Sequence, residues 1–215
     1  MMLLFTTTAL AEPVDVAFGA RPPTLAPGNT SVEAAVDGAP GEAVGELGLA
    51  IGLPRGLQIG VTALSATLGS GLAATDPSLA LGVTALSTDT TSVVVGLGSS
   101  IPLGSELAAL GAELAVSVNL TDALILSATP GLSASLGARE SVEASVPVQL
   151  MAQASRRLFA FAEVAAAPLA PSEGALGLGT TLGSGVLTDI VLAGHGSVAG
   201  ELGAGLGVAV VVPRR

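Results

Sequence analysis

The sequence predicts an all-β protein, a closed antiparallel up-and-down transmembrane β-barrel of about twelve strands. Composition is the first observation behind this prediction. Half of the 215 residues are hydrophobic, only 11% are charged, and the mean hydropathy is +0.76. A soluble domain usually has about 25% charged residues, so these are too few to cover an ordinary water-facing surface. The hydrophobic content also excludes a disordered chain.

The second observation is that the chain has no segment suited to a membrane-spanning helix. Within lipid, only helices and closed barrels satisfy all backbone hydrogen bonds, and a spanning helix needs about 20 apolar residues in a row. The best candidate, residues 203–212, is too short and is followed by Pro213. The 29 glycines and 13 prolines also disfavour long helices. The chain is therefore expected to cross the membrane with strands.

The third observation is an alternation with a period of two residues, which is typical of strands. Between residues 141 and 152, one face is aliphatic and the other carries most of the polar side chains, including Glu143 and Gln149. Residues 113–120 and 197–212 follow the same pattern.

Twelve segments show this alternation. They are residues 30–37, 43–53, 56–66, 78–87, 91–100, 106–119, 122–136, 141–153, 157–168, 174–183, 186–193 and 197–212. Most of them reach the roughly 9–11 residues that a tilted transmembrane strand requires. The count falls to ten if the weakest segments, 30–37 and 186–193, do not span.

The connections between these segments alternate in length. Short ones follow the even-numbered strands, at residues 54–56, 87–90, 119–122, 154–156 and 183–185. Longer connections are expected at residues 68–77 and 168–173, whereas 137–140 and 194–196 are short exceptions. Short periplasmic turns and longer extracellular loops are typical of outer-membrane barrels.

The N-terminal region divides into two parts before the barrel, which is predicted for residues 30–212. Residues 1–11 are interpreted as a truncated signal peptide, because Ala9-Leu10-Ala11 fits the small-residue cleavage pattern; a plain disordered N-terminus is the alternative. Residues 12–29 form a Pro-rich lead-in.

Three features carry a resemblance to a known family: the Pro-rich run 21–28, the turns within 53–61 and 119–124, and alternation over nearly the whole chain. On these the chain resembles the outer-membrane β-barrels of Gram-negative bacteria, in particular small porin-like barrels of unassigned function. The resemblance implies secretion through the inner membrane by a signal peptide and a role in transport. Its implied partners are membrane lipid and the outer-membrane assembly machinery, and a homo-oligomer remains open.

The two faces of the strands are assigned by solvation, because a charge facing lipid costs a few kcal/mol near the midplane. The acidic residues expected to face the lumen are Glu33, Glu46, Glu113, Glu143, Glu163, Asp189 and Glu201. Arg157 is the main basic residue expected there, near the periplasmic end. Rings of acidic residues select cations, so the sequence predicts a passive pore for small, cationic solutes, or else a structural barrel with solvated acids.

Two other classes of protein are weighed against this one. A secreted soluble β-sandwich or adhesin-like surface protein would show the same alternation, but the non-aliphatic face here is rich in Gly, Ala and Ser, which suits a confined interior. A lipid-modifying outer-membrane enzyme would depend on His195, which is expected in a solvated turn without an orienting acid. The chain is therefore not expected to be an enzyme, and no catalytic residue is assigned.

Composition also limits ligands. With no cysteine and one histidine, a Cys-based or multi-His metal site is excluded, and no cofactor is expected. Seven arginines, no lysine and a pI near 4.3 leave no basic surface for nucleic acid.

Proline and aromatic residues predict two local features. Pro130 and Pro147 fall in mid-strand at nearly the same height, which predicts a shared bulge or a local break in pairing. Only Phe159 and Phe161 supply aromatic side chains within the predicted strands.

Overall fold

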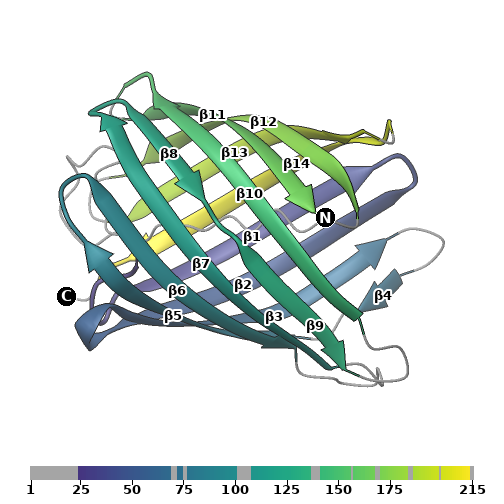
Figure 1. Ribbon diagram of the computed structural model, residues 1–215, viewed down its shortest axis with the longest axis horizontal. Helices are drawn as coiled ribbons and strands as arrows, with labels where there is room; N and C mark the ends of the chain where they lie inside the picture. Colours follow the sequence, from purple (N-terminus) through teal and green to yellow (C-terminus); the bar gives the residue numbers. More distant parts are fainter. Residues whose placement is uncertain are drawn as a thin grey trace.

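A computed structural model of the protein describes residues 24–68, 72–74, 77–100, 108–136, 141–155, 157–167, 170–183, 186–198 and 200–213. Most of these residues lie in tilted antiparallel strands that wrap into a barrel (Figure 1). Within the ranges just given, no helix is long and apolar enough to cross a membrane.

The strands are β1 (Thr30–Ala39), β2 (Glu42–Leu53), β3 (Leu57–Leu68), β4 (Leu72–Ala74), β5 (Ser78–Ser87), β6 (Thr91–Ser100), β7 (Ala108–Thr121), β8 (Leu124–Ala128), β9 (Gly131–Leu136), β10 (Ser141–Gln153), β11 (Leu158–Ala167), β12 (Ala170–Leu182), β13 (Leu187–Ser197) and β14 (Leu202–Val212).

The sheet closes on itself. Apart from β4, β8 and β9, each strand pairs with the next one along the chain, and β14 returns to pair with β1. Strands β8 and β9 share one position between β7 and β10, and the short β4 lies beside β3. The described strands therefore form a twelve-stranded closed barrel. This confirms the predicted fold class, and the β-sandwich hypothesis is wrong.

The two weakest predicted strands both span the barrel, so the ten-strand alternative is wrong. β1 pairs along its length with β2 and β14, and β13 pairs continuously with β12 and β14. Two predicted loops were misplaced. Residues 194–196 belong to β13, and β12 already begins at Ala170 within the connection expected at 168–173. Glycines 194 and 196 suggested a turn, but both lie in regular pairing.

The predicted local break in pairing at the two prolines is confirmed, because the pairing of β10 with β9 ends at Ser145 and its pairing with β8 begins only at Val148. The strand is interrupted between β8 and β9 at Thr129 and Pro130, where proline has no N–H to donate. On the neighbouring strand, β10 runs without a break through Pro147, which pairs with Ala165 of β11. The Thr129 backbone N–H donates to the Pro147 carbonyl at 2.9 Å, so the two strands stay in contact across the interruption.

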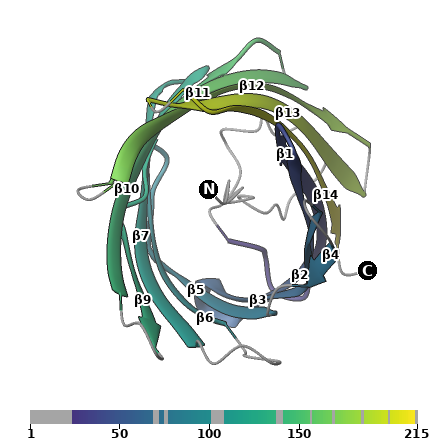
Figure 2. The same ribbon diagram turned by 90° about the vertical axis from the view of Figure 1, so that its right-hand side faces the viewer.

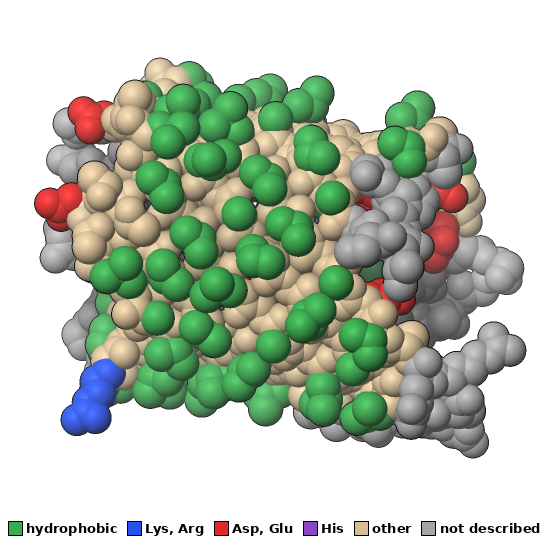
Figure 3. All heavy atoms as spheres, in the orientation of Figure 1, with side chains coloured by type: hydrophobic (Ala, Val, Ile, Leu, Met, Phe, Trp, Pro, Cys, Tyr) green, Lys and Arg blue, Asp and Glu red, His purple; other side chains and the backbone are tan. Residues whose placement is uncertain are grey.

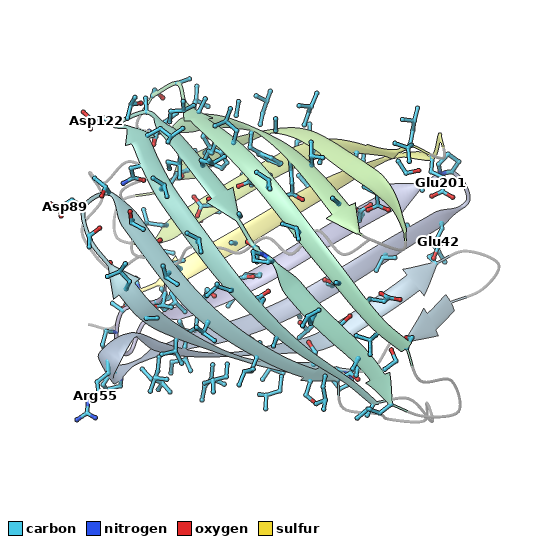
Figure 4. All side chains as sticks on the ribbon, in the orientation of Figure 1. Glu42, Arg55, Asp89, Asp122 and Glu201 are labelled. Atoms are coloured by element: carbon cyan, nitrogen blue, oxygen red, sulfur yellow. The ribbon has the colours of Figure 1, made fainter. Side chains whose placement is uncertain are left out.

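The connections at one end of the barrel are tight, as predicted. This end, called the tight-turn end below, carries the turns after β2, β5, β7, β10 and β12, and it includes Arg55, Asp89 and Asp122 (Figure 4). In the turn after β2, Arg55 and Gly56 both adopt positive φ angles, 66° and 71°. Glu42 and Glu201 lie at the opposite end, called the loop end (Figure 4).

The outer face is an aliphatic belt. Exposed leucine, valine or isoleucine side chains come from every position around the ring, for example Leu49 in β2, Leu97 in β6, Leu150 in β10 and Leu178 in β12. In the view of Figure 3, hydrophobic side chains cover the middle of the barrel, and the coloured charged side chains lie toward its two ends. A monomer in water rarely exposes an apolar area of this extent.

Candidate site inside the barrel

All acidic residues of the described strands lie on one face of the sheet. Residues that pair directly across neighbouring strands point to the same face of the sheet. Followed from strand to strand, the pairings put all of these acids on the face that carries Ala50 and Val211. Those two residues pack against Leu25. Leu25 belongs to the segment that precedes β1, and Figure 2 shows this segment within the ring of strands. The face is therefore the interior one, and the acids on it are Glu33, Asp37, Glu42, Glu46, Glu113, Glu143, Glu163, Glu173 and Asp189.

The structure places six of the seven predicted lumen acids on this interior face: Glu33, Glu46, Glu113, Glu143, Glu163 and Asp189. Glu201 lies instead in the exposed turn between β13 and β14, at the loop end. Arg157 is exposed in the turn before β11 at the tight-turn end. Sequence reasoning missed Asp37, Glu42 and Glu173, although each has the same parity as the interior residues of its strand.

Hydrogen bonds hold three of the interior carboxylates against the wall. Glu33 Oε1 accepts from Ser31 Oγ at 3.0 Å, and Glu163 Oε2 accepts from Gln149 Nε2 at 3.2 Å. Asp189 Oδ1 accepts from Thr181 Oγ1 at 2.6 Å, and both of these residues are buried. Neighbouring polar side chains on the interior face thus fix the position of these negative charges.

Interior glycines make room for larger side chains on the neighbouring strand. Glu113 leans over Gly96, its direct partner across the β6–β7 pair, so that a Cβ there would overlap the carboxylate. The Phe159 ring covers Gly179 in the same way across the β11–β12 pair. This arrangement gives a physical reason for many glycines on the non-aliphatic face, because a pleated wall with side chains at every position could not hold these groups.

The two strand phenylalanines point inward. Phe159 and Phe161 are 4% and 6% exposed and pack with Ala193, with Met151 and Val191 against them. They contribute nothing to the outer face. They form an apolar cluster toward the tight-turn end of the interior.

His195 is not in a turn, so that prediction is wrong. It lies in β13, opposite Gly203 of β14 and Ala175 of β12, and its side chain is half-buried. Its Nε2 atom lies 2.7 Å from Asp37 Oδ1 on β1. The orienting acid that no local spacing could supply therefore comes from a residue 158 positions away.

Charge and apolar packing are unequally distributed along the barrel. The apolar contacts of Leu25, Leu187 and Val211 lie at the tight-turn end, because β1 and β13 begin there and β14 ends there. Most interior acids lie in the middle of their strands or toward the loop end. No group of three or more potential metal ligands occurs among the residues that the structure describes.

Comparisons with known proteins agree with the fold. No protein-family model and no curated protein sequence matches the chain. Among solved structures, the chain is similar to the KdgM porin in complex with disordered oligogalacturonate, with a TM-score of 0.67 and 9% identity over 86% of this chain and 99% of that one. It is similar to the NanC porin, with a TM-score of 0.61 and 10% identity over 83% and 98% of the two chains.

A third likeness is to the translocator domain of the autotransporter NalP from Neisseria meningitidis. The TM-score is 0.56, with 14% identity over 86% of each chain. At such low identities these likenesses establish the fold. The protein is a closed antiparallel β-barrel whose fold is similar to those of these outer-membrane porins.

Proposed function

We propose that the protein is a passive pore of a Gram-negative outer membrane that admits small solutes and prefers cations. The observation that carries the proposal is the separation of residue types between the two faces of the sheet. The outer face presents aliphatic side chains around the whole ring, whereas every acidic residue of the described strands lies on the interior face. Aliphatic residues suit lipid, and a polar interior suits water and solutes.

The sign of the interior charge supports the cation preference. Among the described strand residues, the interior face carries nine carboxylates and no arginine. Acidic side chains lining a pore attract cations and repel anions. A polyanionic sugar such as the oligogalacturonate of the KdgM complex would meet like charge here. The proposed solutes are therefore small cations or uncharged molecules.

The arrangement of charge also gives the proposed pore a direction of entry. Glu42 and Glu201 lie at the loop end, and Asp37, Glu46 and Glu143 lie near that end of their strands. Negative charge gathered at one mouth raises the local concentration of cations there. We assign the loop end to the outside of the cell, because outer-membrane barrels keep short turns on the periplasmic side.

Reversal potentials in planar lipid bilayers under a KCl gradient test the proposal. The wild-type barrel should pass K⁺ in preference to Cl⁻. A triple variant, Glu46→Gln, Glu113→Gln and Glu163→Gln, should lose most of this preference, because it removes interior charge while keeping side-chain size. The matched control is Asp89→Asn with Asp122→Asn, which removes exposed charge at the turns. Anion preference, or a preference that the triple variant does not change, would contradict the proposal.

A further inference from the structure

The first described residues of the chain lie inside the barrel. Figure 2 shows this segment, in purple, within the ring of strands. Leu25 is 1% exposed and packs with Ala50 of β2, Leu187 of β13 and Val211 of β14. Its side chain therefore packs against interior residues of three strands at the tight-turn end of the barrel.

Polar contacts hold the segment at two further strands. The Leu25 backbone N–H donates to Gln58 Oε1 of β3 at 2.9 Å. Thr24 Oγ1 lies 2.9 Å from Thr84 Oγ1 of β5. With the apolar contacts, these bonds attach the segment to β2, β3, β5, β13 and β14.

The barrel wall is shaped to receive this segment. The Gly28 N–H donates to the Gly52 carbonyl at 2.8 Å, and the Gly52 N–H donates to the Asn29 carbonyl at 2.9 Å. A Cβ at Gly52 would overlap the carbonyl oxygens of Leu25 and Ala26. Only glycine leaves space at this position for the backbone to approach so closely.

We infer that residues 24–29 form a constriction of the pore, with Leu25 as its apolar contact to the wall, and that this segment sets the unit conductance and the size limit for solutes. The inference rests on the proposed pore function. The segment occupies part of the cross-section that solutes would otherwise use. It lies at the end opposite the acid-rich mouth, so cations would be collected at one end and selected by size at the other.

A matched pair of substitutions on β2 tests this constriction. Gly52→Ala places a methyl group where the Leu25 and Ala26 carbonyls lie, so the segment must move. Gly48→Ala makes the same change on the same strand and face, but its Cβ would meet nothing nearer than the Val61 carbonyl oxygen at 3.7 Å. In single-channel recordings, Gly52→Ala should increase the unit conductance and admit larger cations, and Gly48→Ala should leave both unchanged.

A second variant leaves every strand intact and covers the case in which Gly52→Ala does not fold. Leu25→Ser weakens the apolar contacts of the segment without altering the wall, and it should also increase the unit conductance. The position of the segment can be measured separately, because the chain has no native cysteine. Leu25→Cys should resist a charged methanethiosulfonate reagent in the Gly48→Ala background and react in the Gly52→Ala background.

The outcomes separate the two proposals. Equal unit conductance in the wild type, Gly52→Ala and Leu25→Ser would overturn the constriction while leaving the pore in place. Fast labelling of Leu25→Cys in the Gly48→Ala background would also overturn it. If none of these proteins conducts, the pore itself is overturned. Conductance in Gly52→Ala and Leu25→Ser alone would support a constriction that closes the wild-type barrel.

Discussion

His195 and Asp37 are joined across an intervening strand, with His195 Nε2 on β13 lying 2.7 Å from Asp37 Oδ1 on β1. Strand β14 runs between them and presents Gly203 opposite His195 and Gly205 opposite Asp37. A Cβ at Gly203 would overlap the imidazole. Two glycines in the middle strand therefore allow side chains of non-adjacent strands to meet. The contact also links the first strand of the barrel to its penultimate strand.

We expect substitutions of His195 and Asp37 to have coupled effects on the free energy of unfolding. In a double-mutant cycle with His195→Ala and Asp37→Ala, the coupling free energy should be about 1 kcal/mol, a usual size for a half-buried hydrogen bond. Urea unfolding in lipid vesicles measures it. The control pairs His195→Ala with Glu113→Ala on the remote strand β7, where the two effects should add. Additivity in the His195 and Asp37 cycle would show that the contact contributes nothing.

The Phe159 ring should make Gly179 intolerant of a methyl group. Gly179→Ala should lower the free energy of unfolding by about 1–3 kcal/mol, because the Cβ and the ring cannot share the same space. In a Phe159→Ala background the same change should be neutral, or stabilise by a few tenths of a kcal/mol through the unfolded chain. A penalty of equal size in both backgrounds would mean that the strand backbone, and not the ring, excludes alanine.

Adjacent residues of β7 should respond in opposite ways to a new charge. Leu114 belongs to the aliphatic belt, and Ala115 lies on the interior face beside Val94. Leu114→Arg should destabilise the inserted barrel by about 2–4 kcal/mol, as for arginine near the bilayer midplane. Ala115→Arg should cost much less, because its charge faces the acidic interior. Unfolding of both variants in vesicles compares them, and a larger penalty for Ala115→Arg would reverse the assignment of faces.

The strand count and the two faces could be predicted from the sequence because a period of two residues is visible locally. Glu33, Glu113 and Glu163 were assigned to the interior from the alternation together with the cost of a charge facing lipid, and the strand pairings place them on the interior face. His195 was misplaced because Gly194-His195-Gly196 has the composition of a turn. The alternation along β13 could have placed it on the interior face, since Asp189 and His195 lie six positions apart.

Contacts that depend on closure of the barrel could not be predicted. Asp37 and His195 are 158 residues apart in the sequence, and they meet only because β14 pairs with β1 when the barrel closes. The apolar site that Leu25 occupies depends in the same way on residues from β2, β13 and β14, and the alternation along single strands does not show that these residues meet. The N-terminal segment before Thr24, including the predicted signal peptide, lies outside the described residues.

The concentration of carboxylates on one side of every acid-bearing strand has a consequence for how the barrel is assembled. If a strand slipped by a single residue against its neighbours, its two sides would change places. For β7 such an error would turn Glu113 toward hydrocarbon, and for β1 it would turn out Glu33 and Asp37. The cost of each exposed acid is greatest near the midplane and falls toward the interfaces. The acids would then favour the native strand register, since only that register keeps all of them out of lipid.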